Sequence, residues 1–318
     1  MATTEIEADR PTDASALVRG VSPVLEVPFT ADGEVDYAGF ERVVRFVLST
    51  GVTSMMFPGF ASEFHKLSED ERRRLTEILL SHTRDRDDVA AVVAVQDHAT
   101  QLAARRAREW VDAGADLINL LPPHFLSPSR GSLVQHVRAV LTAIEPVPLV
   151  LQYAPSETGT SLDAGLLRDI VTDHPNLRLV KVESSPPGPL IAELAAGTPS
   201  LASVEGYAGV QLPDAVRRGA VGTQPGCSMT EVYVEIWRNL TGDDEEAGVD
   251  LHRRLLPYIS YWMLDTERII AAEKLISVRR GLFDSAYCRE PAHRLDSEEI
   301  RMVDRLLVEF ADLLPHLG

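Results

Sequence analysis

The sequence predicts an α/β fold, a (β/α)8 TIM barrel with a C-terminal three-helix appendix. From residue 20 to about residue 242, short apolar runs alternate with amphipathic stretches, the pattern of βα units around a parallel sheet. Several runs are continuous in Val, Ile and Leu, as expected of strands buried on both faces. A doubly wound sheet is the alternative, but the sequence lacks the GxGxxG or GxxxxGKS/T loop expected with it. The barrel is therefore favoured.

The eight predicted strands are short apolar runs, and each is followed by a stretch with helical periodicity. The strands are expected at 21–29, 54–58, 89–95, 117–122, 149–154, 177–183, 203–206 and 220–223. The helices are expected at 36–50, 68–83, 100–113, 133–144, 161–172, 189–196, 212–218 and 231–240. Ser68 with the acidic first turn after it predicts a helix start, and Gly51 and Gly114 are plausible helix stops.

Beyond residue 242 the alternation ends and three helical patterns follow, near 249–264, 267–280 and 297–314. We therefore divide the chain into an acidic N-terminal extension at 1–18, a barrel at 19–242 and a helical region at 243–318 that packs on the barrel. The extension is interpreted as disordered, or as an arm that packs on a neighbouring subunit. It lacks the basic start and apolar core of a signal peptide.

Composition excludes several classes of function. A net charge of −17 over 318 residues argues against nucleic acid and an anionic membrane surface as partners. Cys227 and Cys288 are far apart and form no zinc-binding spacing, so neither a metal site nor a disulfide framework is expected. No apolar run approaches the roughly 18 residues that span a bilayer. A cytoplasmic location is the expectation that fits these features.

Lys181 is the first catalytic candidate. It lies in the strand LRLVKVE, and barrel enzymes place their chemistry at the C-terminal ends of strands. A lysine in an apolar strand favours the neutral amine, which can attack a carbonyl and form a Schiff base. The alternative is a structural ion pair with Glu183 or Glu205. The chain has only two other lysines, Lys66 and Lys274, and both are expected at the surface because their neighbours are charged.

The ordered motifs resemble the dihydrodipicolinate synthase and N-acetylneuraminate lyase family over roughly residues 20–315. The opening GVSPVLEVPFTADGEVDYAGF resembles its first strand and helix, and GFASEFHKLSEDER stands where the family has GTTGE. LPPHFLSPS resembles its PYYNKPS loop, QYAPSETG its YNxPGRTG, and LVKVESS its KEAS lysine strand. EGYAG and RGAVGTQPG resemble the segments that end its last two barrel strands.

This resemblance implies that Lys181 binds a 2-oxo acid, most simply pyruvate, as a Schiff base. Ala61 and Ser62 would bind the carboxylate of that acid through backbone N–H groups and the Ser62 hydroxyl. The alternative is that Ser62 only caps the next turn. No metal or organic cofactor is implied, since the lysine iminium is itself the electron sink. The family also implies a homotetramer or homodimer.

The residues of the family's proton relay are replaced in this chain. Gln152, Phe60 and Phe125 stand where the family has two tyrosines and a threonine, so all three hydroxyls are lost. Gln152 cannot titrate. Three substitutes remain open: Tyr153, if the strand is bulged so that it faces inward; His124 in the following loop; or a water held by Gln152.

Two further residues bear on the second substrate. Gly206 and Tyr207 resemble the GY pair of the lyase branch, although simple packing in the pocket wall is an equal alternative for Tyr207. Glu157 stands where the synthase branch has an arginine that binds the carboxylate of the aldehyde. The reversed charge disfavours an acidic aldehyde and favours a neutral, hydroxylated or cationic one, unless Glu157 merely faces solvent.

The leading hypothesis is a class I aldolase-type lyase or synthase that joins or cleaves a 2-oxo acid and an aldehyde-like partner, outside lysine biosynthesis. One alternative is a sugar-acid dehydratase or hydratase-aldolase that uses the same lysine iminium. The other is a catalytically degenerate family member that binds a 2-oxo acid as a regulator, which the three lost hydroxyls would explain.

Overall fold

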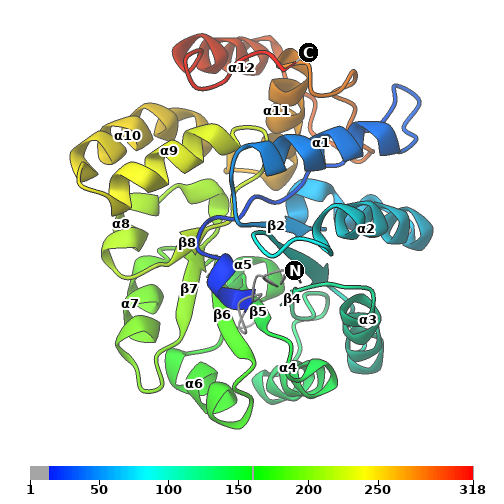
Figure 1. Cartoon of the computed structure of the whole chain (residues 1–318), viewed down its shortest axis with the longest axis vertical. Coiled ribbons are helices and arrows are strands. Elements are labelled where there is room, and N and C mark those ends of the chain that lie inside the picture. Colours follow the sequence, from blue (N-terminus) through cyan, green and yellow to red (C-terminus); the bar gives the residue numbers. More distant parts are fainter. Residues whose placement is uncertain (1–13, 160, 318) are drawn as a thin grey trace, which may run out of the picture.

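The protein forms a (β/α)8 barrel, as the sequence predicts. The computed structural model describes residues 14–159 and 161–317. Eight parallel strands form the centre and helices surround them, with the C-terminal helices gathered at one side (Figure 1). The strands are β1 (Gly20–Val21), β2 (Ser54–Phe57), β3 (Ala90–Val95), β4 (Leu117–Leu120), β5 (Leu149–Tyr153), β6 (Leu177–Val182), β7 (Ala202–Glu205) and β8 (Gly222–Thr223).

The helices follow the predicted order. They are α1 (Tyr37–Ser49), α2 (Glu69–Thr83), α3 (Thr100–Asp112), α4 (Arg130–Ile144), α5 (Pro155–Thr158), α6 (Ala164–Asp173), α7 (Gly188–Ala196), α8 (Leu212–Arg217), α9 (Thr230–Thr241), α10 (Glu245–Trp262), α11 (Thr266–Arg279) and α12 (Ser297–Glu309). Ser68 caps α2 through a reciprocal pair of hydrogen bonds with Glu71, as expected of a capping box. Gly51 and Gly114 adopt positive φ at the helix ends, as predicted. The one-turn helix α5 was not predicted.

The first strand is much shorter than predicted. Only Gly20–Val21 pairs regularly with β8, and Val24 then bridges both Met56 and Gly226 and so closes the barrel. Pro23 and Pro28 lie inside the predicted strand 21–29. Proline has no N–H to donate, so a regular ladder cannot continue through these positions.

Side chains alternate between the inside of the barrel and the helical layer. An inner cluster of buried residues fills the barrel: Val18, Val24, Met56, Ala90, Val92, Ala94, Leu117, Val150, Leu179 and Val204. The alternate strand residues, including Leu151, Val180 and Val182, belong to the larger core between strands and helices. Because strand neighbours point to opposite faces, the residues that continue the inner rows of β5 and β6 are Gln152 and Lys181.

The N-terminal extension differs from the prediction where it is described. Residues 1–13 lie outside the described residues, whereas Ala14–Leu17 form a short 3-10 helix. Leu17 and Val18 pack against the inner cluster, and the Leu17 carbonyl accepts a hydrogen bond from Thr53 at 2.7 Å. Residues 14–18 therefore pack on the chain's own barrel rather than forming a free arm.

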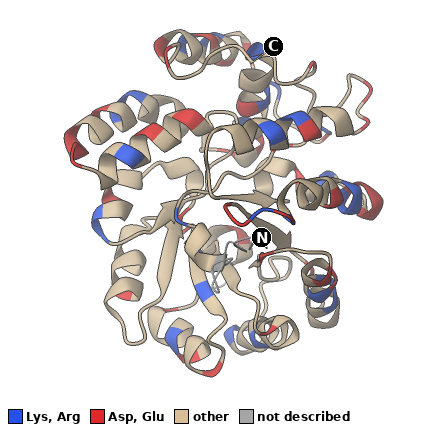
Figure 2. Cartoon of the chain, in the orientation of Figure 1, with Lys and Arg blue, Asp and Glu red and all other residues tan. Residues whose placement is uncertain are grey.

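The charged residues lie mainly on the outer helices (Figure 2). Lys66 and Lys274 are exceptions, and their predicted surface location is wrong. The Lys274 side chain is 1% exposed and pairs with the fully buried Glu63, while Lys66 is 6% exposed and also pairs with Glu63, at 3.1 Å. Lys274 belongs to α11, and Lys66 pairs with Glu267 of the same helix, so both lysines take part in the packing of α11 on the barrel.

The helices after the barrel are present as predicted, and α11 packs against the 3-10 turn η2 (Phe60–Ser62) at the mouth of the barrel. The exact domain boundaries stay a prediction. Within residues 14–159 and 161–317, each helix is too short or too polar to cross a membrane.

Candidate active site

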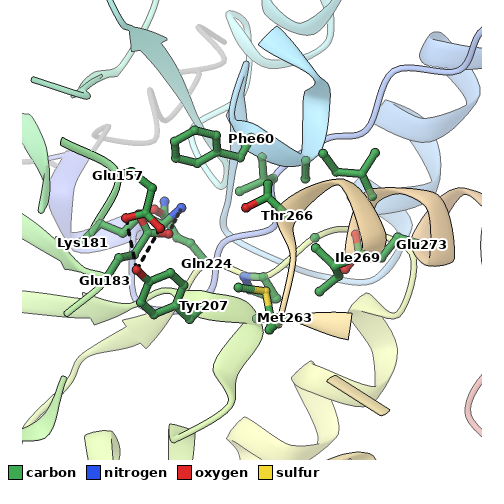
Figure 3. Close-up of a pocket in the computed structure, with 16 residues that line it drawn as sticks. Phe60, Glu157, Lys181, Glu183, Tyr207, Gln224, Met263, Thr266, Ile269 and Glu273 are labelled. Atoms are coloured by element: carbon green, nitrogen blue, oxygen red, sulfur yellow. Dashed lines mark hydrogen bonds and ion pairs between the residues drawn. The ribbon is translucent and has the colours of Figure 1, made fainter. Parts of the chain in front are cut away.

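Lys181 lies at the C-terminal end of β6 and lines a pocket. Its side chain is 5% exposed. The lining combines residues from the ends of the barrel strands with residues of α11: Val24, Phe60, Ala61, Glu157, Lys181, Glu183, Tyr207, Ala208, Gln224, Pro225, Gly226, Met263, Thr266, Ile269, Ile270 and Glu273. In Figure 3, Glu157, Lys181, Glu183 and Tyr207 gather on one side, and Ile269 and Glu273 lie on the other. The pocket is thus at the face of the barrel where such enzymes carry their chemistry.

Glu183 forms an ion pair with Lys181. One carboxylate oxygen of Glu183 lies 3.3 Å from Lys181 Nζ. The other accepts a hydrogen bond from Gln152 Nε2 at 2.7 Å, and Asn119 Nδ2 in turn donates to Gln152 Oε1 at 3.0 Å. The ion pair that the sequence offered as an alternative is therefore present, inside the pocket. Glu183 was not predicted as a site residue, although its position two residues after Lys181 places both on one face of the chain.

Glu205 is a second buried carboxyl group, close enough to Lys181 for the charge of the lysine to act on it. Its oxygens accept hydrogen bonds from the Gln211 N–H at 3.1 Å and from the Thr223 hydroxyl at 3.2 Å. Burial raises the pKa of Glu205 to about 8. At neutral pH this group is therefore largely protonated and adds little negative charge next to Lys181.

Tyr207 and Glu157 form a pair in the pocket wall. The Tyr207 hydroxyl lies 3.0 and 3.1 Å from the two carboxylate oxygens of Glu157 and donates to them. Burial raises the pKa of both groups. Glu157 is thus not a solvent-facing loop residue, and Tyr207 does more than pack, since its hydroxyl orients that carboxylate.

Gly206 leaves room for the Glu183 side chain because it has no Cβ. A Cβ at this position would lie 2.3 Å from Glu183 Cγ, so any other residue would displace Glu183. The next two residues, Tyr207 and Ala208, adopt left-handed φ values of 46° and 53°. This strained turn directs Tyr207 into the pocket, and such strain is typical of functional sites.

The segment predicted to bind a carboxylate is only partly in the pocket. Phe60 and Ala61 line it. Ser62 is fully buried, and its hydroxyl donates to the Leu25 carbonyl and accepts from the Gly59 N–H at 2.9 Å. The Ser62 N–H donates to the Gly59 carbonyl at 3.0 Å. The predicted carboxylate contact of Ser62 is wrong in this structure, because its polar groups already hold the turn together.

Gln152, Tyr153, His124 and Phe125 are absent from the pocket lining. Tyr153 is buried in the core between strands and helices, and its hydroxyl bonds the backbone of Leu162. The irregularity in β5 lies between Leu149 and Val150, and the pairing of Gln152 with Lys181 leaves Tyr153 facing outward. The bulge that would have turned Tyr153 towards the lysine is therefore absent at this position, and Gln152 lies beside Lys181 instead.

His124 and Phe125 lie in the loop after β4, where their rings contact other aromatic rings. The His124 ring centroid is 6.4 Å from that of Phe64 and 4.5 Å from that of His98. Burial lowers the pKa of His124, which favours the neutral ring. Phe125 is 70% exposed. Neither residue lines the pocket that contains Lys181, so His124 is not placed to transfer protons at the lysine.

The pocket lining includes an acidic residue of α11 that the sequence did not reveal. Glu273 of α11 is 3% exposed, lines the pocket and lies near Glu26. Burial raises the pKa of Glu273 to about 8 and that of Glu26 to about 7. Ser277 donates a hydrogen bond to Glu26. No group of three or more His, Cys, Asp or Glu residues in the described part of the chain is arranged to hold a metal ion.

Glu273→Gln is expected to flatten the pH dependence of stability. The pKa of Glu273 is raised from its ordinary 4.5 to about 8, so between these values the folded protein binds a proton that the unfolded chain has lost. The contribution of Glu273 to the free energy of unfolding is therefore complete below pH 4.5 and is lost as pH rises towards 8. The loss is at most about 1.4 kcal/mol per pH unit for one group. Urea unfolding at pH 6 and pH 8 should show a smaller loss for the variant, by about 2 kcal/mol. Equal losses in both proteins would contradict an ionisation penalty at Glu273.

Comparison with known proteins places this geometry in a family. The model of the dihydrodipicolinate synthetase family matches residues 17–309. A 4-hydroxy-tetrahydrodipicolinate synthase from Salinibacter ruber is 28% identical over 258 residues, which cover 80% of this chain and 83% of the relative. The enzyme of that name from Haloarcula marismortui is 26% identical over 290 residues, or 88% of this chain and 90% of the relative.

Solved structures share the fold. A dihydrodipicolinate synthase from Rhodopseudomonas palustris superposes with a TM-score of 0.83 at 24% identity, over 92% of this chain and 97% of that one. A prophage protein of the dihydrodipicolinic acid synthase family from E. coli K12, solved in complex with pyruvate, gives a TM-score of 0.82 at 22% identity, over 92% and 98% of the two chains. The resemblance predicted from the sequence is confirmed: the chain belongs to the dihydrodipicolinate synthetase family and is an aldolase-type lyase.

Proposed function

We propose that this enzyme forms a Schiff base between Lys181 and pyruvate, or a close 2-oxo acid, and makes or breaks a C–C bond to an aldehyde-like partner. One observation carries the proposal: Lys181 is the only cation among the described residues that line the pocket, and it is buried at the end of a barrel strand. The pyruvate complex of the E. coli K12 relative supports a 2-oxo acid as the first substrate.

The chemistry needs a single amine. Its nitrogen attacks C2 of the 2-oxo acid, and loss of water gives an iminium. The iminium withdraws electrons from C3, so that C3 can lose a proton and become a nucleophilic enamine. The enamine then attacks the aldehyde carbon, and hydrolysis of the iminium releases the product and the lysine.

The acceptor is proposed to be neutral and hydroxylated, or cationic, rather than acidic. Glu157 lines the pocket, and the described lining contains no arginine that would bind a second carboxylate. An acidic aldehyde would be repelled by Glu157, because like charges in a partly buried site raise the free energy of binding. On this basis we propose an acceptor outside lysine biosynthesis, unlike that implied by the name of the relatives.

The proposal is tested by borohydride reduction of the protein in the presence of pyruvate, followed by peptide mass mapping. Reduction should add one pyruvate-derived group to Lys181. The same preparation is then supplied with pyruvate and a panel of aldehydes that carry a carboxylate, hydroxyl groups or an amine. An unmodified Lys181 would refute the Schiff base, and a preference for the carboxylated aldehyde would refute the proposed acceptor.

Glu157→Arg is expected to shift acceptor preference towards an acidic aldehyde. The change replaces a repulsive carboxylate by a cation that can pair bidentately with a carboxylate. We expect the ratio of kcat/KM for the carboxylated aldehyde to that for a neutral hydroxyaldehyde to rise about 10- to 100-fold. Glu157→Gln is the matched control, since it removes the charge without adding a partner, and it should give a smaller rise. An unchanged ratio in Glu157→Arg would show that Glu157 does not face the acceptor.

A further inference from the structure

We propose that Glu183 is the catalytic acid–base residue of this active site. This inference rests on the proposed Schiff base at Lys181 and assigns the proton transfers that follow it. Gln152, Phe60 and Phe125 supply no titratable hydroxyl, and Tyr153 and His124 do not line the pocket. The reaction nevertheless requires a group that removes a proton from C3 and later returns one.

The distances place Glu183 next to the reacting atoms. Its Oε1 is 3.3 Å from Lys181 Nζ, and both side chains line the pocket (Figure 3). In the iminium, Nζ is bonded to C2 of the substrate, so C3 is only two bonds from Nζ. A carboxylate at hydrogen-bond distance from that nitrogen is within reach of a C3 proton, which is the first requirement for a general base.

Neighbouring groups hold Glu183 in this orientation. Gln152 Nε2 donates to Glu183 Oε2 at 2.7 Å, which leaves Oε1 facing Lys181. Asn119 fixes the Gln152 amide from behind through a bond of 3.0 Å. On the other side, the carboxylate packs against Gly206, where no side chain competes for the space. Gln152 is therefore a positioning residue: it takes the place of a phenol but acts through Glu183.

Glu205, Glu157 and Tyr207 form hydrogen bonds with other partners. Glu205 accepts two hydrogen bonds, from Gln211 and Thr223, within the barrel. The Tyr207 hydroxyl donates to Glu157, so the two form a closed pair. Glu183 alone has one oxygen fixed by an amide and the other directed at Nζ, which distinguishes it from these groups as the base.

The carboxyl group of Glu183 can carry out both proton transfers of the reaction. Glu183 removes a proton from C3 of the iminium; the C3–H electrons form the C2–C3 double bond, and the C2–N π pair returns to nitrogen. The enamine C3 then attacks the aldehyde carbon, and the aldehyde oxygen takes the proton from the Glu183 carboxylic acid to become a hydroxyl. Cleavage follows the same steps in reverse, and no oxidant or reductant is involved.

The test follows exchange of the pyruvate methyl protons in D2O by proton NMR, without an acceptor. Wild-type protein should exchange them, because every enamine formed at Lys181 releases one C3 proton. Glu183→Gln keeps the shape and the contact with Gln152 but cannot accept the proton. We expect its exchange rate to be about 10²- to 10⁴-fold lower. The borohydride adduct at Lys181 should still reach its wild-type extent on long incubation, which shows that the variant is folded.

Two variants complete the test. Tyr153→Phe removes a hydroxyl outside the pocket and should exchange at the wild-type rate, while Glu183→Asp keeps a carboxylate and should recover part of the exchange lost in Glu183→Gln. Exchange in Glu183→Gln within about threefold of wild type would overturn the proposal, and so would loss of the adduct in both Glu183 variants, since Glu183 would then only hold the lysine. A wild-type protein that forms no adduct refutes the Schiff base itself, whereas a wild-type adduct without exchange refutes only the acid–base assignment.

Discussion

Lys181→Arg is expected to abolish the borohydride-dependent pyruvate adduct and to lower kcat/KM by at least about 10³-fold. Arginine keeps the positive charge and can still pair with Glu183, which lies 3.3 Å from the lysine nitrogen, so the fold should be retained. The guanidinium stays protonated at every accessible pH and presents no lone pair to a carbonyl. The variant thus separates the charge of Lys181 from its nucleophilicity, and intact-protein mass after reduction with pyruvate measures the difference.

Lys66→Arg is the matched control for this substitution. Lys66 pairs with Glu63 and Glu267 outside the pocket, so the same exchange there should leave the adduct and the turnover close to wild type. A persistent single adduct in Lys181→Arg, mapped to another residue, would contradict the assignment of the nucleophile. Stabilisation of both wild type and Lys181→Arg by pyruvate, with no turnover by either protein, would instead favour a degenerate 2-oxo acid-binding protein.

The fold could be predicted almost entirely because it rests on local patterns. Continuous apolar runs fix the strands, and the helix ends follow from residues such as Ser68, Gly51 and Gly114. The first strand was overestimated because its residues are apolar, while Pro23 and Pro28 prevent the ladder. The one-turn helix α5 gives no periodic signal, since four residues are too few to define a face.

The site could be predicted only in part because its contacts join distant segments. Lys181 was identified from its strand, and the choice between Gln152 and Tyr153 required the register of β5 against β6. Glu183 follows from the same alternation, but its orientation depends on Asn119, more than 60 residues earlier in the chain. The local sequence pattern predicts the strand face on which a residue lies. It does not predict the distant residue whose hydrogen bond orients the side chain.

The two remaining lysines illustrate the same limit with the opposite outcome. EFHKLSED has the charged surroundings of an exposed segment, and in AAEKL the residue before Lys274 is charged. The partner that buries Lys274 is Glu63, 211 positions away, and Lys66 is buried by Glu63 together with Glu267. Charge neutralisation across the interface between the barrel and α11 makes burial of these groups tolerable, and no local pattern reports that interface.

Lys274→Met is expected to lower the free energy of unfolding by about 3 kcal/mol, at the lower end of the range for breaking a buried ion pair. The side chains of Lys274 and Glu63 are 1% and 0% exposed. Lys274 also lies over the Phe29 ring, with Nζ 4.2 Å from the centroid. Methionine fills much of the same volume but leaves the Glu63 carboxylate with less compensation, although Lys66 and the Arg289 N–H still contact it.

Two further variants separate the cost of the unpaired Glu63 charge from the cost of lost packing. Glu63→Gln combined with Lys274→Met removes both charges, so the double variant should be more stable than Lys274→Met alone, because the cost of the single change comes mainly from the unpaired carboxylate. Arg294→Met breaks an exposed pair with Glu290, in which the side chains are 86% and 53% exposed, and should cost less than about 0.5 kcal/mol. Urea unfolding followed by circular dichroism at pH 7 measures all three. A loss below about 1 kcal/mol in Lys274→Met would mean that the buried Glu63 carboxylate does not depend on this partner.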